Sequence, residues 1–376
     1  MKKIIFILII LSFVFSFGYA DEYEELIDEY TREYSAKIEE GLQNVDFDAE
    51  KIIRDASKGK LDLSFEKLGS WIAEIVIPEV KVASKAMLCL ISVILAGAFL
   101  LNLQNSGIDG GAQKAGNLYI FLIATGLIAN VFSNIAVVTY STVSSVSLFL
   151  KCLFPVMLLS LYSAGCISST LVFRPILSAV VTLSVHIIEK ILIPVTVLSF
   201  AVTIADCLSE KTRADKFAGF MTKTVKWLLA CMLTIFTGLI GLQSIATSTF
   251  DGLSVKLTKL ATSNLVPVVG GLLSETVETV MGCSVVIKNS VGICGILAVL
   301  YICIVPLIKI GINILLLRFT AAVMQPVSDD KIIKCISSAA DILSLLFGIV
   351  ASVIVMFVLI ITILINMGNS AVLFGR

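Results

Sequence analysis

The residues from Ala115 to Leu150, AGNLYIFLIATGLIANVFSNIAVVTYSTVSSVSLFL, include no Asp, Glu, Lys, Arg or His. A helix of about 20 such residues crosses roughly 30 Å of hydrocarbon, so this run predicts membrane-spanning helix. Similar uncharged runs cover residues 86–108, 227–250 and 342–375. The alternating pattern of a membrane β-barrel is absent, and helices satisfy their own backbone hydrogen bonds in lipid. The sequence therefore predicts an all-α, polytopic membrane helix bundle.

The composition of the chain supports a membrane location. Hydrophobic residues make up 57% and charged residues 15%, and the mean hydropathy is +1.00. These values lie outside the range of soluble domains, so the lipid bilayer is the expected surrounding. The formal net charge is zero. The total charge therefore gives no reason to expect nucleic-acid binding or a strong overall attraction to anionic lipid, although the distribution of charge matters more than its sum.

The N-terminus has the pattern of a secretory signal peptide over residues 1–20. Lys2 and Lys3 precede an apolar run, and Gly18 and Ala20 place small residues where a signal peptidase reads them. An uncleaved first membrane anchor is the alternative. Either reading places Asp21 outside the cytoplasm.

Residues 21–85 change character, because acidic residues are concentrated in their first part. Apolar residues spaced three or four apart, such as Leu26, Tyr30 and Tyr34, indicate amphipathic helices. We expect a small acidic extracytoplasmic helical domain, which packs on the membrane part or on another protein because it is small for an independent fold. A solvated acidic face is the alternative role for its charges.

Residues 86–376 are predicted to form a multi-span membrane domain whose orientation follows the positive-inside rule. The best landmark is 209–226, a basic stretch with apolar residues at helical spacing, which predicts a cytoplasmic amphipathic connector. We expect 118–140 to leave the cytoplasm and 143–162 to re-enter it. Residues 176–207 must then cross an even number of times, as two short helices that form a hairpin or a re-entrant pair. The total is seven or eight membrane helices after the signal.

Several polar residues fall inside the predicted spans, and each is costly in lipid. They either snorkel to an interface or mark a polar pathway. These intramembrane residues are Lys151, His186, Glu189, Lys190 and Lys309.

Residues 251–290 differ most from a lipid-facing helix. Two stripes of apolar residues indicate two short amphipathic helices, and Pro267, Gly270 and Gly271 predict a bend between them. We expect this extracytoplasmic hairpin to lie at the outer interface. It either packs over the bundle, or it lines a pore or docks a partner. The candidate residues for partner docking or a conduit are Asp251, Lys256, Lys259, Glu278, Lys288 and Asn289.

The sequence offers no catalytic site, metal site or cofactor site. The nine cysteines are an odd number without a CxxC pair, so they are expected to pack between helices. The chain has a single histidine, and no glycine-rich loop with the lysine and hydroxyl of a nucleotide site is present. Glu275 and Glu278 share a helical face, but nothing nearby supports acid–base chemistry. Any energy for transport is therefore expected to come from another protein.

The same hairpin segment strongly resembles the stage III sporulation protein AE family of endospore-forming bacteria. Flanking stretches at 234–238, 306–309 and 325–326 support the resemblance, which covers most of the chain. Gly270-Gly271 and Ser274-Glu275 depart from the family pattern, in which a lysine and an aspartate are commoner. The residues that carry the resemblance are Asp251, Gly252, Lys256, Lys259, Ser263, Asn264, Pro267 to Gly270, Glu278 to Val280, Gly282, Cys283, Lys288, Asn289 and Gly292.

The resemblance implies a component of the secretion-like channel complex that joins mother cell and forespore and sustains late forespore development. The chain would be a multi-pass protein of the mother-cell membrane. Its partners would be other membrane proteins of the stage III sporulation complex, including an ATPase acting in trans. A self-sufficient secondary transporter, with Lys151, His186 or Lys309 in a closed cavity, is the main alternative. A scaffold without a conduit is a third possibility.

Overall fold

The structure is a computed structural model, and it describes most of the chain from residue 34 onward. The predicted signal peptide, 1–20, lies outside the described residues. Backbone is described for 34–36, 38–39, 48–58, 65–104, 110–164, 167–208, 214–265, 270–328 and 330–367. Side chains are described over these ranges except at 65–71, 100–104, 110–115, 117, 167–169, 244–265 and 270–281.

The described residues form helices and no strand, which confirms the all-α prediction. In chain order the elements are α3 (Ala49–Ser57), α4 (Phe65–Gln104), α5 (Gly110–Ser163), α6 (Ile167–Ile187), the π-helical turn η1 (Ile188–Leu192), α7 (Ile193–Leu208), α8 (Asp215–Leu265), α9 (Gly270–Met324) and α10 (Asp330–Asn366).

Six helical segments within the described residues are long and apolar enough to cross a membrane. The chain is therefore a multi-pass membrane protein, with fewer spans there than the seven or eight predicted. The six segments are Ile72–Phe99, Leu118–Ser163, Thr170–Leu208, Asp215–Gln243, Gly282–Met324 and Asp330–Asn366.

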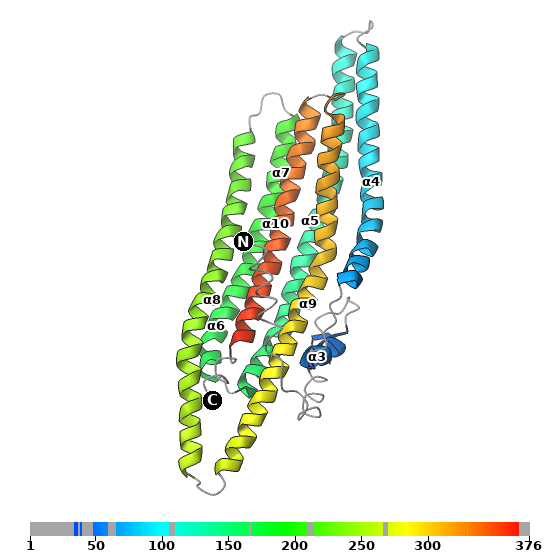
Figure 1. Cartoon of the computed structure of the whole chain (residues 1–376). Coiled ribbons are helices and arrows are strands. Elements are labelled where there is room, and N and C mark those ends of the chain that lie inside the picture. Colours follow the sequence, from blue (N-terminus) through cyan, green and yellow to red (C-terminus); the bar gives the residue numbers. More distant parts are fainter. Residues whose placement is uncertain are drawn as a thin grey trace.

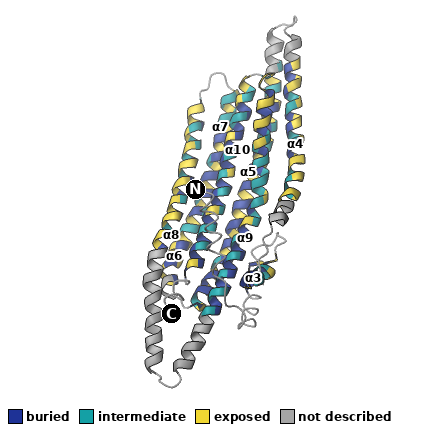
Figure 2. Ribbon diagram, viewed as in Figure 1, coloured by how far each residue is buried: buried dark blue, intermediate teal, exposed yellow. Residues whose placement is uncertain are grey.

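The helices run along one axis around α10, which contacts α5, α7, α8 and α9 (Figure 1). In the most apolar window of α10, 61% of the residues are buried, against 22–39% in the other five segments. A helix that is apolar on all sides belongs in the centre of a bundle, and α10 occupies that place (Figure 2). The helices around it keep exposed apolar faces that suit contact with lipid.

Glycines let α9 approach its neighbours closely. A Cβ atom at Gly292 would collide with the Ile365 side chain of α10. A Cβ at Gly295 would lie 2.6 Å from Leu153 Cδ2 of α5. Small residues at such positions allow helix backbones to pack tightly where lipid supplies no hydrophobic driving force.

The prediction that 118–140 and 143–162 are separate spans is wrong, because both belong to the continuous helix α5. The polar residues at the expected break bond back to their own helix. Thr139 and Thr142 donate to the carbonyls of Ile135 and Val138 at 2.9 and 2.7 Å. No loop is needed to satisfy these hydroxyl groups.

The hairpin or re-entrant pair predicted over 176–207 is also wrong, because α6, η1 and α7 form one continuous helix. Pro194 cannot donate a hydrogen bond, and its ring would clash with the carbonyl of Lys190 in a regular α-helix. Lys190 lies in the π-helical turn η1, which widens the helix at that point. The proline is thus absorbed without a break.

Each of these two corrections removes one crossing, so together they leave the predicted side of the start of α8 unchanged. Each segment runs the length of the bundle once instead of twice. The end of α7 and the start of α8 therefore still lie opposite α3, together with the ends of α4 and α9 and the starts of α5 and α10 (Figure 1). We call the end that carries α3 and the C-terminal end of α10 the α3 end.

The two short helices predicted over 251–290 are instead parts of two long ones. Asp251, Lys256 and Lys259 lie on α8, whereas Glu278, Lys288 and Asn289 lie on α9. Gly270 and Gly271 begin α9, and Pro267 lies outside the described residues. Gln243 and Lys288 bond to the last turn of α10, at Ile363 and Ile365. The helical hairpin between residues 243 and 288 therefore projects beyond the end of α10 (Figure 1).

The described part of the predicted N-terminal domain packs on the bundle. Tyr34, Ile38 and Ile53 are buried in the same apolar core as the membrane helices. Helix α3 contacts α9, and Asp48 caps α3 by accepting a 2.9 Å hydrogen bond from the backbone of Lys51. The described part of the N-terminal segment therefore lies against the bundle at the α3 end.

Candidate functional site

The candidate site lies at the α3 end, where the projecting hairpin leaves the bundle, and Lys288 marks its base. Its side chain is fully buried (0% exposed). The ammonium group donates hydrogen bonds to the carbonyls of Ile365, at 2.7 Å, and Met367. The last carbonyls of a helix lack partners within the helix and form the negative end of its dipole. Lys288 therefore caps the C-terminal end of α10 and is not a surface residue.

Asn289 follows Lys288 and has a different environment. Its side-chain oxygen is buried and has no hydrogen-bond partner among the described residues. A buried acceptor without a partner costs about 1–3 kcal/mol. Asn289 thus places a buried amide oxygen, unpaired among the described residues, at the base of the hairpin.

The remaining predicted docking or conduit residues lie farther out on the hairpin. The structure places the backbone of Asp251, Lys256 and Lys259 on α8 and that of Glu278 on α9. Their side chains are not among those described. Their proposed role therefore stays a prediction.

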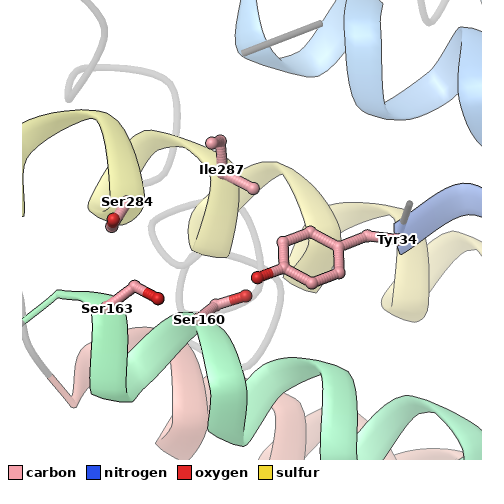
Figure 3. A pocket seen from close by; sticks show the side chains of 5 residues that line it. All are labelled: Tyr34, Ser160, Ser163, Ser284 and Ile287. Atoms are coloured by element: carbon pink, nitrogen blue, oxygen red, sulfur yellow. The ribbon is translucent and has the colours of Figure 1, made fainter. Parts of the chain in front are cut away.

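A small pocket lies next to the base of the hairpin, between the N-terminal segment, α5 and α9 (Figure 3). The space in and around it is about 180 Å³, which includes open solvent at its mouth. Ser160 and Ser163 donate to the carbonyls of Val156 and Leu159, so their oxygens remain available as acceptors. Figure 3 shows the Tyr34 hydroxyl pointing toward Ser160. The residues that line the pocket are Tyr34, Ser160, Ser163, Ser284 and Ile287.

Sequence reasoning missed this pocket. Single serines on a membrane helix are common, and nothing in their spacing connects them with Tyr34, which lies in a segment far away in the chain. The lining offers neutral hydroxyl groups, which suit water or another small polar group. It contains no pair of nucleophile and base.

The predicted intramembrane residues do not gather in one place. Lys309 lies 3.7 Å from Glu79 of α4, a partner that the sequence did not indicate, and their side chains are 34% and 22% exposed. Lys151, His186 and Lys190 are exposed on the outside of the bundle, and Glu189 is half-buried.

A second small pocket lies inside the bundle beside η1. It is lined by one serine and seven apolar residues, and none of the predicted intramembrane charges reaches it: Val143, Ser184, Val185, Ile188, Phe236, Val353, Met356 and Phe357. Among the described residues, no group of three His, Cys, Asp or Glu side chains is placed to hold a metal ion. Four of the cysteines, Cys283, Cys294, Cys303 and Cys335, are buried as free thiols.

Comparison with known proteins identifies the family of the chain. The family model described as stage III sporulation protein AE matches residues 47–368. The chain is 27% identical over 293 residues to the stage III sporulation protein AE of Bacillus subtilis (strain 168), an alignment that covers 77% of this chain and 73% of that protein. No solved structure matches. Because the family model spans most of its length, the chain belongs to the stage III sporulation protein AE family.

Proposed function

We propose that this protein is an integral component of the secretion-like channel complex that links mother cell and forespore and supports late forespore development. Membership of the family implies a role in sporulation. The chain would sit in the mother-cell membrane, with its mature N-terminus and the projecting hairpin outside the cytoplasm. Other membrane proteins of the stage III sporulation complex would bind it there.

The observation that carries this proposal is the length of the hairpin beyond α10. Residues 244–265 of α8 extend roughly 33 Å past the level at which Gln243 bonds to Ile363, at 1.5 Å per residue. A paired helical arm of that length reaches well outside the rest of the bundle. Such an arm suits contact with a partner.

The same geometry disfavours the alternative of a self-sufficient transporter. Such a protein needs polar residues around a cavity near the middle of the membrane. Lys151 and His186 are exposed, Lys309 pairs with Glu79 of α4, and the pocket beside η1 is almost wholly apolar. A conduit that involves this chain would therefore form between chains.

The proposal assigns no enzymatic step to the chain, and the family is not a known enzyme family. Energy would come from an ATPase acting in trans. The purified protein alone is expected neither to bind nor to hydrolyse ATP. ATP turnover that persists after rigorous removal of contaminating ATPases would overturn this assignment.

Charge reversal on the hairpin tests the docking role. We expect Lys259→Glu or Glu278→Lys to block forespore development while leaving the protein abundant in the membrane. Lys81→Glu is the control, because Lys81 is exposed on α4, away from the hairpin. Sporulation efficiency and membrane protein level are measured together in each strain. Normal sporulation in both hairpin strains would remove the docking role, and loss of the protein in both would assign the hairpin to packing alone.

Co-purification from sporulating cells distinguishes a complex component from a transporter. The wild-type chain should retain membrane partners that the Lys259→Glu chain loses. Transport of a solute by the purified chain alone in vesicles would instead support the transporter.

A further inference from the structure

The first turns of α8, from Asp215 to Trp227, carry two kinds of exposed side chain on one face. Phe217, Phe220 and Trp227 are 53%, 65% and 67% exposed. Three lysines in the same turns, Lys216, Lys223 and Lys226, are also exposed. At 3.6 residues per turn, the aromatic residues and the lysines fall on adjoining strips of the helix. We call this surface the α8 face.

The orientation of the α8 face is set by the bundle. Ala218 and Val225, on the opposite side of α8, are 6% and 0% exposed. The Ser199 hydroxyl of α7 donates to the carbonyl of Ala218 at 3.4 Å. Asp206 accepts a 2.7 Å hydrogen bond from the backbone of Ala214, just before α8 begins. These contacts hold the helix so that the aromatic and lysine strips point away from the protein.

The α8 face ends where the uncharged part of the span begins. Trp227 directly follows Lys226, and no charged residue occurs from Trp227 to Phe250. Tryptophan is favoured at the boundary between acyl chains and headgroups, where lysine reaches outward from an apolar stem.

The charge of the α8 face is positive. Three lysines stand against the single carboxylate of Asp215. At the same end of the bundle, Lys334 is exposed near the start of α10, beside Asp330, and Arg318 and Asp341 pair with each other at 3.0 Å. The face therefore complements a negatively charged group held at the level of the headgroups.

We propose that the α8 face is a binding site for the headgroups of anionic phospholipids. The phosphate would lie between the lysines, and the aromatic side chains would contact the upper acyl chains. The chain as a whole is neutral, so this affinity is a local property of α8. It is independent of the hairpin and of any partner that the hairpin binds.

Trp227 can report on this site directly, because the chain has two tryptophans, Trp71 and Trp227. The Trp71→Phe chain is reconstituted in phosphatidylcholine vesicles to which brominated phosphatidylglycerol or brominated phosphatidylcholine is added at equal mole fraction. Bromine near the headgroup is expected to quench Trp227 fluorescence more than bromine at the acyl-chain ends. Brominated phosphatidylglycerol is expected to quench more strongly than brominated phosphatidylcholine, with a relative association constant of about five or more, since one lysine near an anionic surface contributes about that factor.

The lysines are then removed in the same background. In K216Q/K223Q/K226Q the preference for phosphatidylglycerol should fall to about one, while Lys223→Gln alone should give an intermediate value. The control is K81Q/K85Q/K151Q, which removes three exposed lysines elsewhere and should keep the full preference. Circular dichroism and thermal unfolding show that each variant is folded, and the Lys223→Gln chain carries the test if the triple variant is not.

Three results would overturn the site. Equal quenching by the two lipids would show that the face has no charge preference. A preference that survives in both lysine variants would place the anionic site elsewhere on the protein. If neither lipid quenches Trp227, the face is covered by water or protein.

Discussion

The ammonium nitrogen of Lys288 lies 2.7 Å from the carbonyl oxygen of Ile365, and this contact joins the base of the α8–α9 hairpin to the end of α10. The two residues are 77 positions apart in the chain. A lysine that sequence reasoning assigns to a docking surface is therefore part of the internal framework. We therefore expect replacement of Lys288 to change the stability of the fold.

Replacing Lys288 should destabilise the fold. Lys288→Met keeps most of the side-chain volume but leaves the buried carbonyls of Ile365 and Met367 without their donor. We expect a loss of about 1–3 kcal/mol in the free energy of unfolding. Thermal unfolding of the purified protein in detergent measures this loss, and Lys151→Met, at an exposed lysine, is the control. Equal stability of the Lys288→Met and wild-type chains would contradict the capping role.

The close approach of α9 to α10 predicts opposite effects of alanine at two glycines. A Cβ at Gly292 would collide with Ile365, which is buried at 2% exposure, so Gly292→Ala should cost about 1–3 kcal/mol. A Cβ at Gly348 has no such neighbour within 4 Å, so Gly348→Ala should stabilise α10 by up to about 1 kcal/mol. Unfolding midpoints of the two variants are compared. A Gly292→Ala chain as stable as Gly348→Ala would exclude tight packing at this position.

The continuous helix α5 predicts that Ser163 is outside the cytoplasm, whereas two spans in its place would put Ser163 inside. Single cysteines at Ser163 and Ala214 are introduced into a cysteine-free chain. An impermeant thiol reagent added to intact cells should label the cysteine at position 163 and spare that at 214. Labelling at 214 would reverse the orientation of the whole bundle. Protection at 163 that disappears on permeabilisation would restore two spans in this region.

The ion pair between Glu79 and Lys309 predicts coupling between α4 and α9. The two side chains lie 3.7 Å apart, so we expect an interaction free energy of about 0.5–3 kcal/mol between them. Glu79→Gln and Lys309→Met should each destabilise the protein, and the double variant should cost less than the sum of the two. Unfolding free energies of the four chains measure the coupling. Strict additivity would show that the two residues do not interact.

The number of membrane-spanning helices cannot be read directly from the length and spacing of the apolar runs. Hydropathy shows that 115–150 is apolar, but it does not distinguish one long helix from two short ones. The hydroxyl groups of Thr139 and Thr142 are satisfied within α5, so these polar residues mark no loop. At Pro194 the π-helical turn η1 relieves the clash between the proline ring and the preceding turn, and no local sequence pattern predicts that turn. Both errors concern how a polar group or a proline is accommodated.

The candidate site was predictable in part. The sequence identifies residues 251–290 as the distinctive segment, and the end of α8 and the start of α9 both fall within them. The pocket formed by Tyr34, Ser160 and Ser284 was not recognised, because its residues come from three separate parts of the chain. The sequence also does not predict Glu79 as the partner of Lys309, because the two residues lie on different helices.

The sequence by itself determined that the chain is a helical membrane protein, because hydropathy and backbone hydrogen bonding act within each segment and lipid admits few alternatives. It also determined which segment is least suited to lipid. Only the tertiary structure decided which charges are buried, which are paired and which face outward. Lys288 and Lys223 have the same chemistry, but one is enclosed by the end of α10 and the other lies on the α8 face. That difference arises from contacts between distant segments, and these depend on how whole helices pack.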